Sequence, residues 1–164
     1  FKLVKEDKIW TGVDNGGTKW FKVPDHYEIE TETRIKTVDG QKYFSMGSVY
    51  WFTNLDNRKR HEDIILFKTY YGNESEYPNF DNYNAINVNK VADIPIDYKG
   101  VMGVPITFID KYNPEQFEII SSNDVRVNET VAVKEHGLIK DKEGAINGKP
   151  TYVRVLIKNK KLWA

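Results

Sequence analysis

The stretch "GVMGVPITFIDKYNPEQFEII", residues 100–120, carries the strongest local signals in the chain. Its β-branched and aromatic residues from 104 to 109 predict a strand, which the polar run that follows would end. Asn113 can cap a short helix through its side-chain oxygen, and Pro114 suits the first position of such a helix. Strand character resumes at Phe117. The stretch therefore predicts a strand, a capped turn and a second strand.

Most of the chain on either side of this stretch has the patterns of strands. The pair Asp39-Gly40 is typical of a two-residue hairpin turn, and the pair Asn147-Gly148 is typical of a turn. The unbroken apolar runs 49–52 and 64–67 favour strands that are buried on both faces. The end of a helix is expected in residues 1–7, and strands are expected in residues 9–13, 19–23, 27–38, 43–55, 64–67, 131–133 and 151–158.

The composition excludes several classes of protein. The 164 residues include 24 basic and 24 acidic ones, so any contact with DNA must come from local basic clusters. No run approaches the ~20 apolar residues of a membrane-spanning helix, and no signal peptide is visible. The absence of cysteine excludes disulfides, cysteine-based zinc sites and a cysteine nucleophile. These features are consistent with a cytoplasmic protein.

Several longer segments carry a family resemblance. They are residues 100–120 together with "YFSMGSVYWFTNLD" (43–56), "KRHE" (59–62), "DNYNAINVNKVADIPIDYKGVMGVPITF" (81–108) and, more weakly, "INGKPTYVRVLIK" (146–158). They resemble the C-terminal part of EcoRI-type adenine-specific DNA methyltransferases. The chain departs from the expected pattern at Asn84 and near Lys99, where acidic residues are expected, and in residues 121–143.

The resemblance implies an α+β, β-rich fold. It would contain the trailing strands of a Rossmann-like methyltransferase sheet and a β-rich target-recognition lobe. Residues 9–13 and 49–54 would be the last two strands of that sheet. The implied domains are residues 1–70, the trailing part of the methyltransferase fold, and residues 71–164, the C-terminal lobe, packed together as one unit.

The resemblance also defines what is missing from this sequence. Such enzymes hold a flipped adenine with an Asn/Asp-Pro-Pro-aromatic motif, but this chain has no Pro-Pro pair. Asn113-Pro114-Glu115 lacks the second proline and the aromatic residue, and Asp14-Asn15-Gly16-Gly17 is only a turn signal, not a glycine-rich cofactor loop. Both motifs lie upstream in the family. We therefore expect a fragment with no catalytic residue and no bound cofactor, from a parent enzyme that uses S-adenosylmethionine.

Three polar segments are candidates for contact with double-stranded DNA. The densest cationic run, 58–61, can bind phosphates, while a hairpin tip at 15–20 offers amide, ammonium and indole groups to base edges and faces. The third segment is the polar and aromatic loop 82–87. Each of them can equally be an ordinary solvated loop or turn. The candidate residues are Asn15, Thr18, Lys19, Trp20, Arg58, Lys59, Arg60, His61, Asn82 and Asn84.

The resemblance thus implies the DNA-recognising part of an S-adenosylmethionine-dependent N6-adenine DNA methyltransferase of a type II restriction–modification system. The alternative is a stand-alone β-rich module that binds nucleic acid or protein without catalysis. A small hydrolase is a third class, although no carboxylate pair is singled out by its surroundings. His26, His61 and His136 lack the spacing of metal ligands, so no metal site is expected. The pattern indicates neither the DNA sequence recognised nor the oligomeric state.

Overall fold

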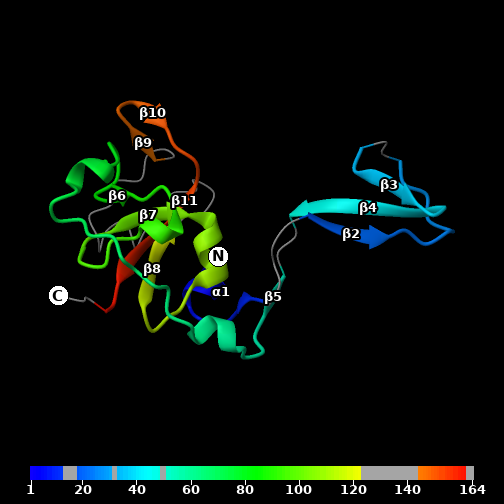
Figure 1. Cartoon of the computed structure of the whole chain (residues 1–164), viewed down its shortest axis with the longest axis horizontal. Coiled ribbons are helices and arrows are strands. Elements are labelled where there is room, and N and C mark those ends of the chain that lie inside the picture. The colour runs from blue at the N-terminus through cyan, green and yellow to red at the C-terminus, as the bar shows by residue number, and fades with distance from the viewer. Residues whose placement is uncertain (13–17, 31–32, 49–50, 123–143, 162–164) are drawn as a thin grey trace. The chain divides into compact units, whose positions relative to one another are not determined.

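The computed structural model describes residues 1–12, 18–30, 33–48, 51–122 and 144–161. The chain forms two compact units, one made of Phe1–Trp10 and Asn54–Ala164 and the other of Thr11–Thr53 (Figure 1). Both are rich in strands, and the described helices are short, which confirms the β-rich class. The expected division between residues 70 and 71 concerns the fold of the parent protein and stays a prediction.

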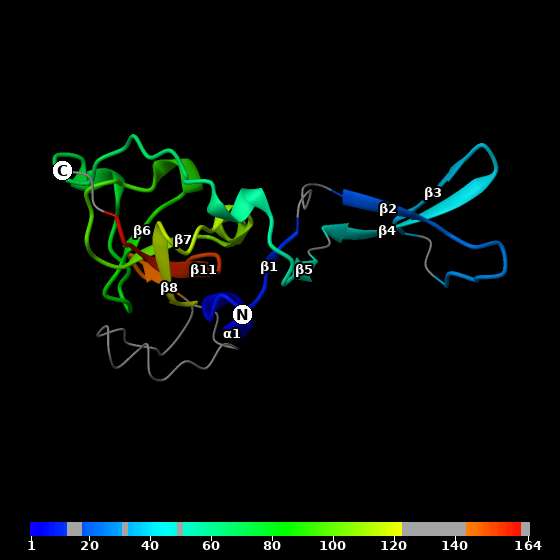
Figure 2. The ribbon, with the colours of Figure 1, turned by 90° about the horizontal axis from the view of Figure 1, so that it is seen from below.

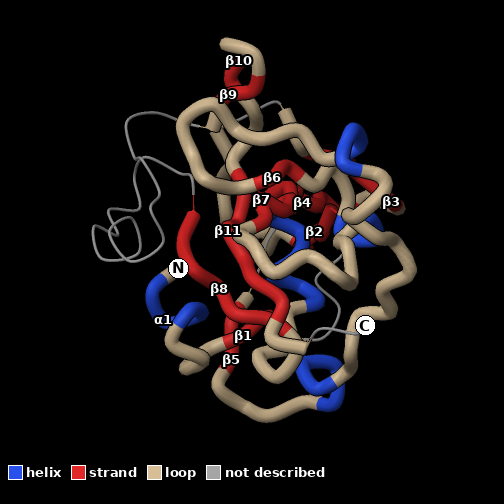
Figure 3. Tube along the Cα trace, turned by 90° about the vertical axis from the view of Figure 1, so that its left-hand side faces the viewer, coloured by secondary structure: helices blue, strands red, loops and turns tan. Residues whose placement is uncertain are grey.

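Among the described residues of the first unit, the helices are the short helix α1 (Lys2–Lys5) and four 3-10 helices, η1 (Arg58–His61), η2 (Glu74–Glu76), η3 (Val91–Asp93) and η4 (Ile106–Lys111). Its strands are β6 (Ile86–Asn87), β7 (Met102–Pro105), β8 (Phe117–Ser122), β9 (Ala145–Ile146), β10 (Lys149–Pro150) and β11 (Arg154–Asn159). Long irregular segments connect these elements, as the tan parts of the tube show (Figure 3). Within the described ranges, none of the helices has the length and apolar content needed to cross a membrane.

A four-stranded sheet organises the first unit. Its strand order is β6-β7-β11-β8, with β6 parallel to β7 and the other neighbours antiparallel (Figure 2). The strand expected in residues 151–158 is formed from Arg154 onward as β11, in which Val155 and Ile157 enter one buried cluster while Leu156 enters another. β11 is therefore a central strand with apolar packing on both faces.

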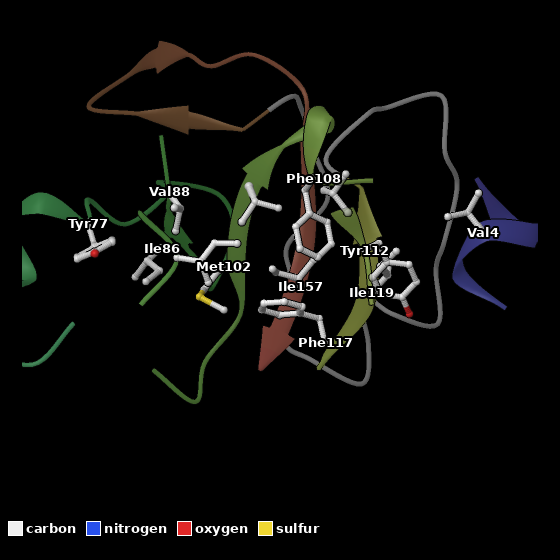
Figure 4. Packing of buried hydrophobic residues seen from close by; sticks show 13 residues of the cluster. Val4, Tyr77, Ile86, Val88, Met102, Phe108, Tyr112, Phe117, Ile119 and Ile157 are labelled. Atoms are coloured by element: carbon white, nitrogen blue, oxygen red, sulfur yellow. The ribbon is translucent and has the colours of Figure 1, made fainter. Parts of the chain in front are cut away.

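The main core lies on one face of this sheet, where aromatic and aliphatic side chains from η4, β7, β8 and β11 meet (Figure 4). The ring of Phe108 meets the ring of Phe117 edge-on, with 5.2 Å between their centroids. Both rings are fully buried, together with Met102 and Ile86. This packing fixes η4 against the sheet and so positions the segment between η4 and β8.

The quoted stretch folds partly as expected. Strand structure ends at Pro105, and residues 106–111 form η4, so the predicted strand from 104 to 109 is wrong beyond its first two residues. Proline fixes φ near a helical value and suits the start of a helix, and Phe108 then reaches the core while Ile106 stays exposed. The capped turn is confirmed, because Asn113 Oδ1 accepts a hydrogen bond from the Glu115 backbone N–H at 2.9 Å, but residues 114–116 form a turn and not the short helix that was expected.

The expectation that two apolar runs are buried on both faces is wrong. Trp51 and Phe52 are exposed, and the other two residues of the first run lie outside the described residues. The second run is not a strand, and its side chains alternate: Ile64 and Leu66 pack against the core, whereas Ile65 and Phe67 are 85% and 68% exposed. The side chain of Gln116 bonds both the N–H and the C=O of Ile64, and so replaces a neighbouring strand.

The second unit contains an antiparallel sheet with strand order β2-β4-β3, formed by β2 (Thr18–Lys22), β3 (Ile35–Val38) and β4 (Gln41–Ser48). The Asp39-Gly40 turn is confirmed, because both residues have positive φ values, 49° and 78°. Among the described residues of the strand expected at 27–38, only the end is formed, as β3. The strand candidates at 9–13 and 43–55 yield β1 (Trp10–Thr11), β4 and β5 (Phe52–Thr53), of which β1 and β5 pair with each other.

Candidate nucleic-acid interface

The basic run 58–61 forms the 3-10 helix η1, which Asn57 caps by accepting a hydrogen bond from the Arg60 backbone N–H at 3.3 Å. Arg60 turns toward the protein, and its side chain is only 13% exposed. Its guanidinium lies 3.5 Å from the centroid of the Trp10 ring and pairs with Asp7 at 2.5 Å. A second ion pair, at 3.7 Å, joins it to Asp56. Arg60 therefore connects η1 to the N-terminal segment.

The other residues of η1 have different surroundings. The Arg58 side chain is 93% exposed and pairs with Glu62 at 3.2 Å. His61 Nε2 lies 2.8 Å from Asp56 Oδ1, and this hydrogen bond is the main cause of the lowered pKa of the Asp56 carboxyl. Lys59 is half-buried near Asp110. Burial raises the pKa of the Asp110 carboxyl, and the positive charge of Lys59 partly offsets this rise. Of the two arginines, Arg58 is thus the one whose side chain faces solvent.

An open hollow of about 680 Å³ lies beside η1. Its lining includes Lys5, Arg60 and Lys160 together with Asp7, Glu115 and Glu118. Because cations and carboxylates both line it, the hollow offers no concentration of positive charge to a phosphate. The buried ring of Tyr112 forms part of the wall.

We expect the titration of Tyr112 to make the chain less stable at alkaline pH. Burial, with Asp7 and Glu118 adding to it, raises the pKa of the Tyr112 phenol from 10.0 to about 12, and Arg60 opposes the shift. The raised pKa means that the neutral Tyr112 phenol contributes stability that is fully present below about pH 10. This contribution is lost as the pH rises toward about 12. Urea unfolding at about pH 8 and about pH 11 measures the loss, which we expect to be smaller in Tyr112→Phe.

The control for this experiment is Tyr152→Phe, because the Tyr152 side chain is exposed. This variant is expected to lose as much stability between the two pH values as the unmodified chain does. An equal loss in Tyr112→Phe would show that other groups cause the alkaline destabilisation.

The loop at 82–87 is tied to the hairpin of β9 and β10. Asn82 Oδ1 accepts a hydrogen bond from the Ala145 backbone N–H at 3.1 Å, whereas Asn84 is exposed. The neighbouring Asp81 accepts hydrogen bonds from the backbone N–H groups of Asn147 at 3.0 Å and Gly148 at 2.7 Å. The positive φ values of these two residues, 51° and 73°, confirm the predicted turn there. Asn82 thus has a structural partner, and Asp81 is a structural residue that the sequence pattern did not single out.

The third segment lies in the second unit. Asn15 is outside the described residues, and Thr18, Lys19 and Trp20 begin β2. The ammonium group of Lys36 lies 4.4 Å from the centroid of the Trp20 ring and 5.8 Å from that of Tyr43. Lys36 and Tyr43 are not among the candidates predicted from the sequence.

A signal for these two residues is nevertheless present in the sequence. A two-residue turn at Asp39-Gly40 pairs Val38 with Gln41, and two positions further along the hairpin it pairs Lys36 with Tyr43. The candidate residues do not form one site in the structure. Those of β2 belong to the second unit, whereas η1 and the Asn82 loop contact different elements of the first. In the parts of the chain that the structure describes, no group of three His, Cys, Asp or Glu side chains is placed to hold a metal ion.

Comparison with known proteins gives consistent matches along the chain. A family model described as "Adenine-specific methyltransferase EcoRI" matches residues 1–160. The chain is 51% identical over 164 residues to "Type II methyltransferase M.EcoRI" of Escherichia coli, and the match covers 99% of this chain and 46% of that protein. "Type II methyltransferase M.MpnI" of Mycoplasma pneumoniae is 36% identical, with 98% and 52% covered.

A third relative, "Type II methyltransferase M.MgeORF184P" of Mycoplasma genitalium, is 35% identical, and the match covers 99% of this chain and 53% of that protein. The chain spans about half the length of the curated relatives it matches. No solved structure matches the chain.

Proposed function

The chain belongs to the family of the adenine-specific methyltransferase EcoRI, and from this membership we propose that it is the C-terminal, DNA-recognising part of such an enzyme. The parent enzyme would transfer a methyl group from S-adenosylmethionine to N6 of adenine within a type II restriction–modification system. The observation that carries the proposal is the 51% identity to M.EcoRI along 99% of this chain. The proposed function implies a cytoplasmic location, because bacterial DNA lies in the cytoplasm.

The division of labour within the parent rests on coverage and on motifs. The relatives have about as much chain again outside the matched region, and the 164 residues contain no Pro-Pro pair. We assign the adenine pocket and the methyl-donor pocket to the part of the parent that this chain does not span. We also propose that β1 and β5 are the last two strands of the Rossmann-like methyltransferase sheet of the parent.

The hollow beside η1 does not fit S-adenosylmethionine. An adenine ring is bound in a mostly apolar cleft with a few placed polar groups, whereas this hollow is open and lined by interleaved ammonium and carboxylate groups such as Lys5, Asp7 and Lys160. We therefore derive no methyl-transfer step from the residues described here. Their proposed task is to bind and orient duplex DNA.

The proposed contacts follow from exposure and charge. Arg58 and Lys59 on η1 carry positive charges that suit phosphates, and phosphate contacts position a duplex without reading its sequence. Thr18, Lys19 and Trp20 on β2 supply hydroxyl, ammonium and indole groups. The exposed Asn84 is a further candidate, while Asn15, Arg60, His61 and Asn82 stay predictions from the sequence.

Two measurements on the purified chain test the proposal. Fluorescence anisotropy with a short labelled duplex is expected to show binding that weakens steeply between about 50 mM and 200 mM salt, because phosphate contacts release counterions. A radiolabelled methyl-transfer assay with S-adenosylmethionine and DNA is expected to give no turnover from this chain alone.

Each measurement can contradict one half of the proposal. Methyl transfer by this chain would show that the catalytic pockets are not confined to the rest of the parent. Failure to bind DNA even at low salt would instead favour the alternative, a β-rich module that binds another protein. The first unit buries its own aromatic and aliphatic core, so such a module is physically reasonable.

A further inference from the structure

We propose that one face of the β2-β4-β3 sheet docks onto the sugar–phosphate backbone of duplex DNA, through Trp20, Lys22, Lys36 and Tyr43. The inference rests on the proposed function and deepens it, because it names the surface of the second unit that meets the substrate. Neither Lys22, Lys36 nor Tyr43 was a candidate from the sequence.

The strand register places these residues on the same face. Lys22 of β2 and Lys36 of β3 are both direct cross-strand partners of Tyr43, and direct partners lie on one side of a sheet. Trp20 is two residues from Lys22 and so points the same way. The 4.4 Å distance between the Lys36 ammonium and the Trp20 ring supports this assignment independently. We call these four side chains the docking face.

The opposite face has a different chemistry. Phe44 has Phe21 and Ile35 as its cross-strand partners, which makes the centre of that face apolar. Lys42 pairs with Thr37 and belongs to it as well. The two faces of one small sheet therefore differ in character while sharing the same backbone, and this provides matched positions for experiments.

The charge of the strands fits a polyanion. Together β2, β3 and β4 contain four basic residues and no carboxylate; the four are Lys19, Lys22, Lys36 and Lys42. The acidic residues of the second unit lie outside these strands; they are Asp14, Asp25, Glu28, Glu30, Glu32 and Asp39. The charges within the three strands are therefore all positive, although the whole unit has six acidic residues and five basic ones.

The side chains of the docking face are accessible and chemically suited to a nucleic-acid backbone. Lys22 and Lys36 are exposed, and Trp20 is 39% exposed. Ammonium groups pair with phosphate oxygens, the indole N–H can donate to a phosphate, and aromatic rings pack against sugars and bases. The Arg60 side chain of η1, by contrast, is only 13% exposed and contacts Asp7 and Trp10.

Duplex DNA is the occupant that charge complementarity favours. Lysines on one face of the sheet can pair with phosphates along the backbone of the duplex. The docking face carries ammonium groups rather than the paired amides that read adenine edges, so it would position the duplex and leave base recognition to other residues.

The experiment measures binding of the purified chain to a short fluorescein-labelled duplex over a range of salt concentrations. Lys36→Gln and Lys22→Gln are each expected to weaken binding about three- to tenfold at low salt and to reduce the salt slope by about 0.9 per lost phosphate contact. Lys42→Gln, on the opposite face, is expected to change the affinity less than about twofold. Near-ultraviolet circular dichroism reports whether each variant keeps its aromatic packing.

A gain of binding provides a second test, which loss of folding cannot imitate. Val38 shares the docking face with Lys36, whereas Thr37 points to the other side. Val38→Lys is expected to tighten DNA binding and steepen the salt slope, and Thr37→Lys is expected to do neither.

The outcomes distinguish failure of the docking face from failure of the proposed DNA-recognising function. If the unmodified chain binds DNA but the variants on the two faces behave alike, the docking face is wrong and the DNA-recognising function stands. If the unmodified chain does not bind DNA at low salt, the function itself is overturned. Equal tightening by Val38→Lys and Thr37→Lys would indicate a non-specific effect of added charge and would also overturn the docking face.

Discussion

Replacing Arg60 with alanine is expected to lower the free energy of unfolding by about 2–3 kcal/mol, whereas Arg58→Ala changes it by less than about 0.5 kcal/mol. The two arginines are two positions apart in η1, but only Arg60 is packed: its guanidinium covers the Trp10 ring and pairs with Asp7. Loss of a nearly buried ion pair leaves a carboxylate without its partner. The cost is reduced here because the Asp7 side chain is 41% exposed and can be hydrated.

Urea unfolding followed by far-ultraviolet circular dichroism measures this difference. Arg60→Lys is an informative third variant, because it keeps the charge but loses the flat guanidinium that stacks on Trp10. Its stability is expected to lie between those of Arg60→Ala and the unmodified chain. Equal stability of Arg60→Ala and Arg58→Ala would show that the contacts of Arg60 with Trp10 and Asp7 contribute nothing measurable.

The role of Arg60 affects how DNA-binding experiments on η1 are interpreted. If all basic residues of the run were replaced together, weaker binding could come from unfolding as well as from lost phosphate contacts. Arg58 is the position where a change in salt dependence reports on DNA alone, because its side chain is 93% exposed. The stability measurement on Arg60 therefore has to come first.

Local chemistry explains which parts of the fold the sequence predicted. The Asp39-Gly40 and Asn147-Gly148 turns need only a backbone that tolerates positive φ, and the cap at Asn113 needs only a side-chain oxygen two residues before a free N–H. The strand at β11 was predicted from its β-branched and aliphatic residues, which enter apolar clusters on both faces of the sheet. Each of these features depends on a few adjacent residues.

Contacts between distant residues explain what the sequence did not predict. Ile64 has its backbone satisfied by Gln116, which lies 52 positions away, so an apolar run that resembles a strand needs no strand partner. Arg60 turns inward because Asp7, 53 positions away, meets it. A pattern of residue types cannot show which member of a basic run will find such a partner.

The candidate interface illustrates the same limit. Thr18, Lys19 and Trp20 were predicted from a turn and its polar residues, but the residues that surround Trp20 come from β3 and β4. Lys36 becomes visible only when the register of the hairpin is combined with the pairing of β2 to β4. Surface chemistry on a sheet depends on which strands are neighbours, and single-strand patterns do not contain that information.

Phe117→Ala is expected to have the largest effect on stability, a loss of about 3–5 kcal/mol in the free energy of unfolding. The Phe117 ring is fully buried at the start of β8 and meets Phe108 edge-on, so its removal leaves a cavity between η4 and the sheet. Since small domains are stable by only about 5–15 kcal/mol, this one change would remove a large part of the total.

The matched control is Ile106→Ala, which truncates an exposed side chain of η4 and is expected to cost less than about 1 kcal/mol. Urea unfolding monitored by hydrogen exchange of the β11 amides measures the stability of the first unit directly, because β11 is central in its sheet. A loss below about 1 kcal/mol for Phe117→Ala would mean that η4 collapses into the space left by the ring. The position of η4 would then depend on its chain connections to Pro105 and Asn113 rather than on the packing of Phe108 against Phe117.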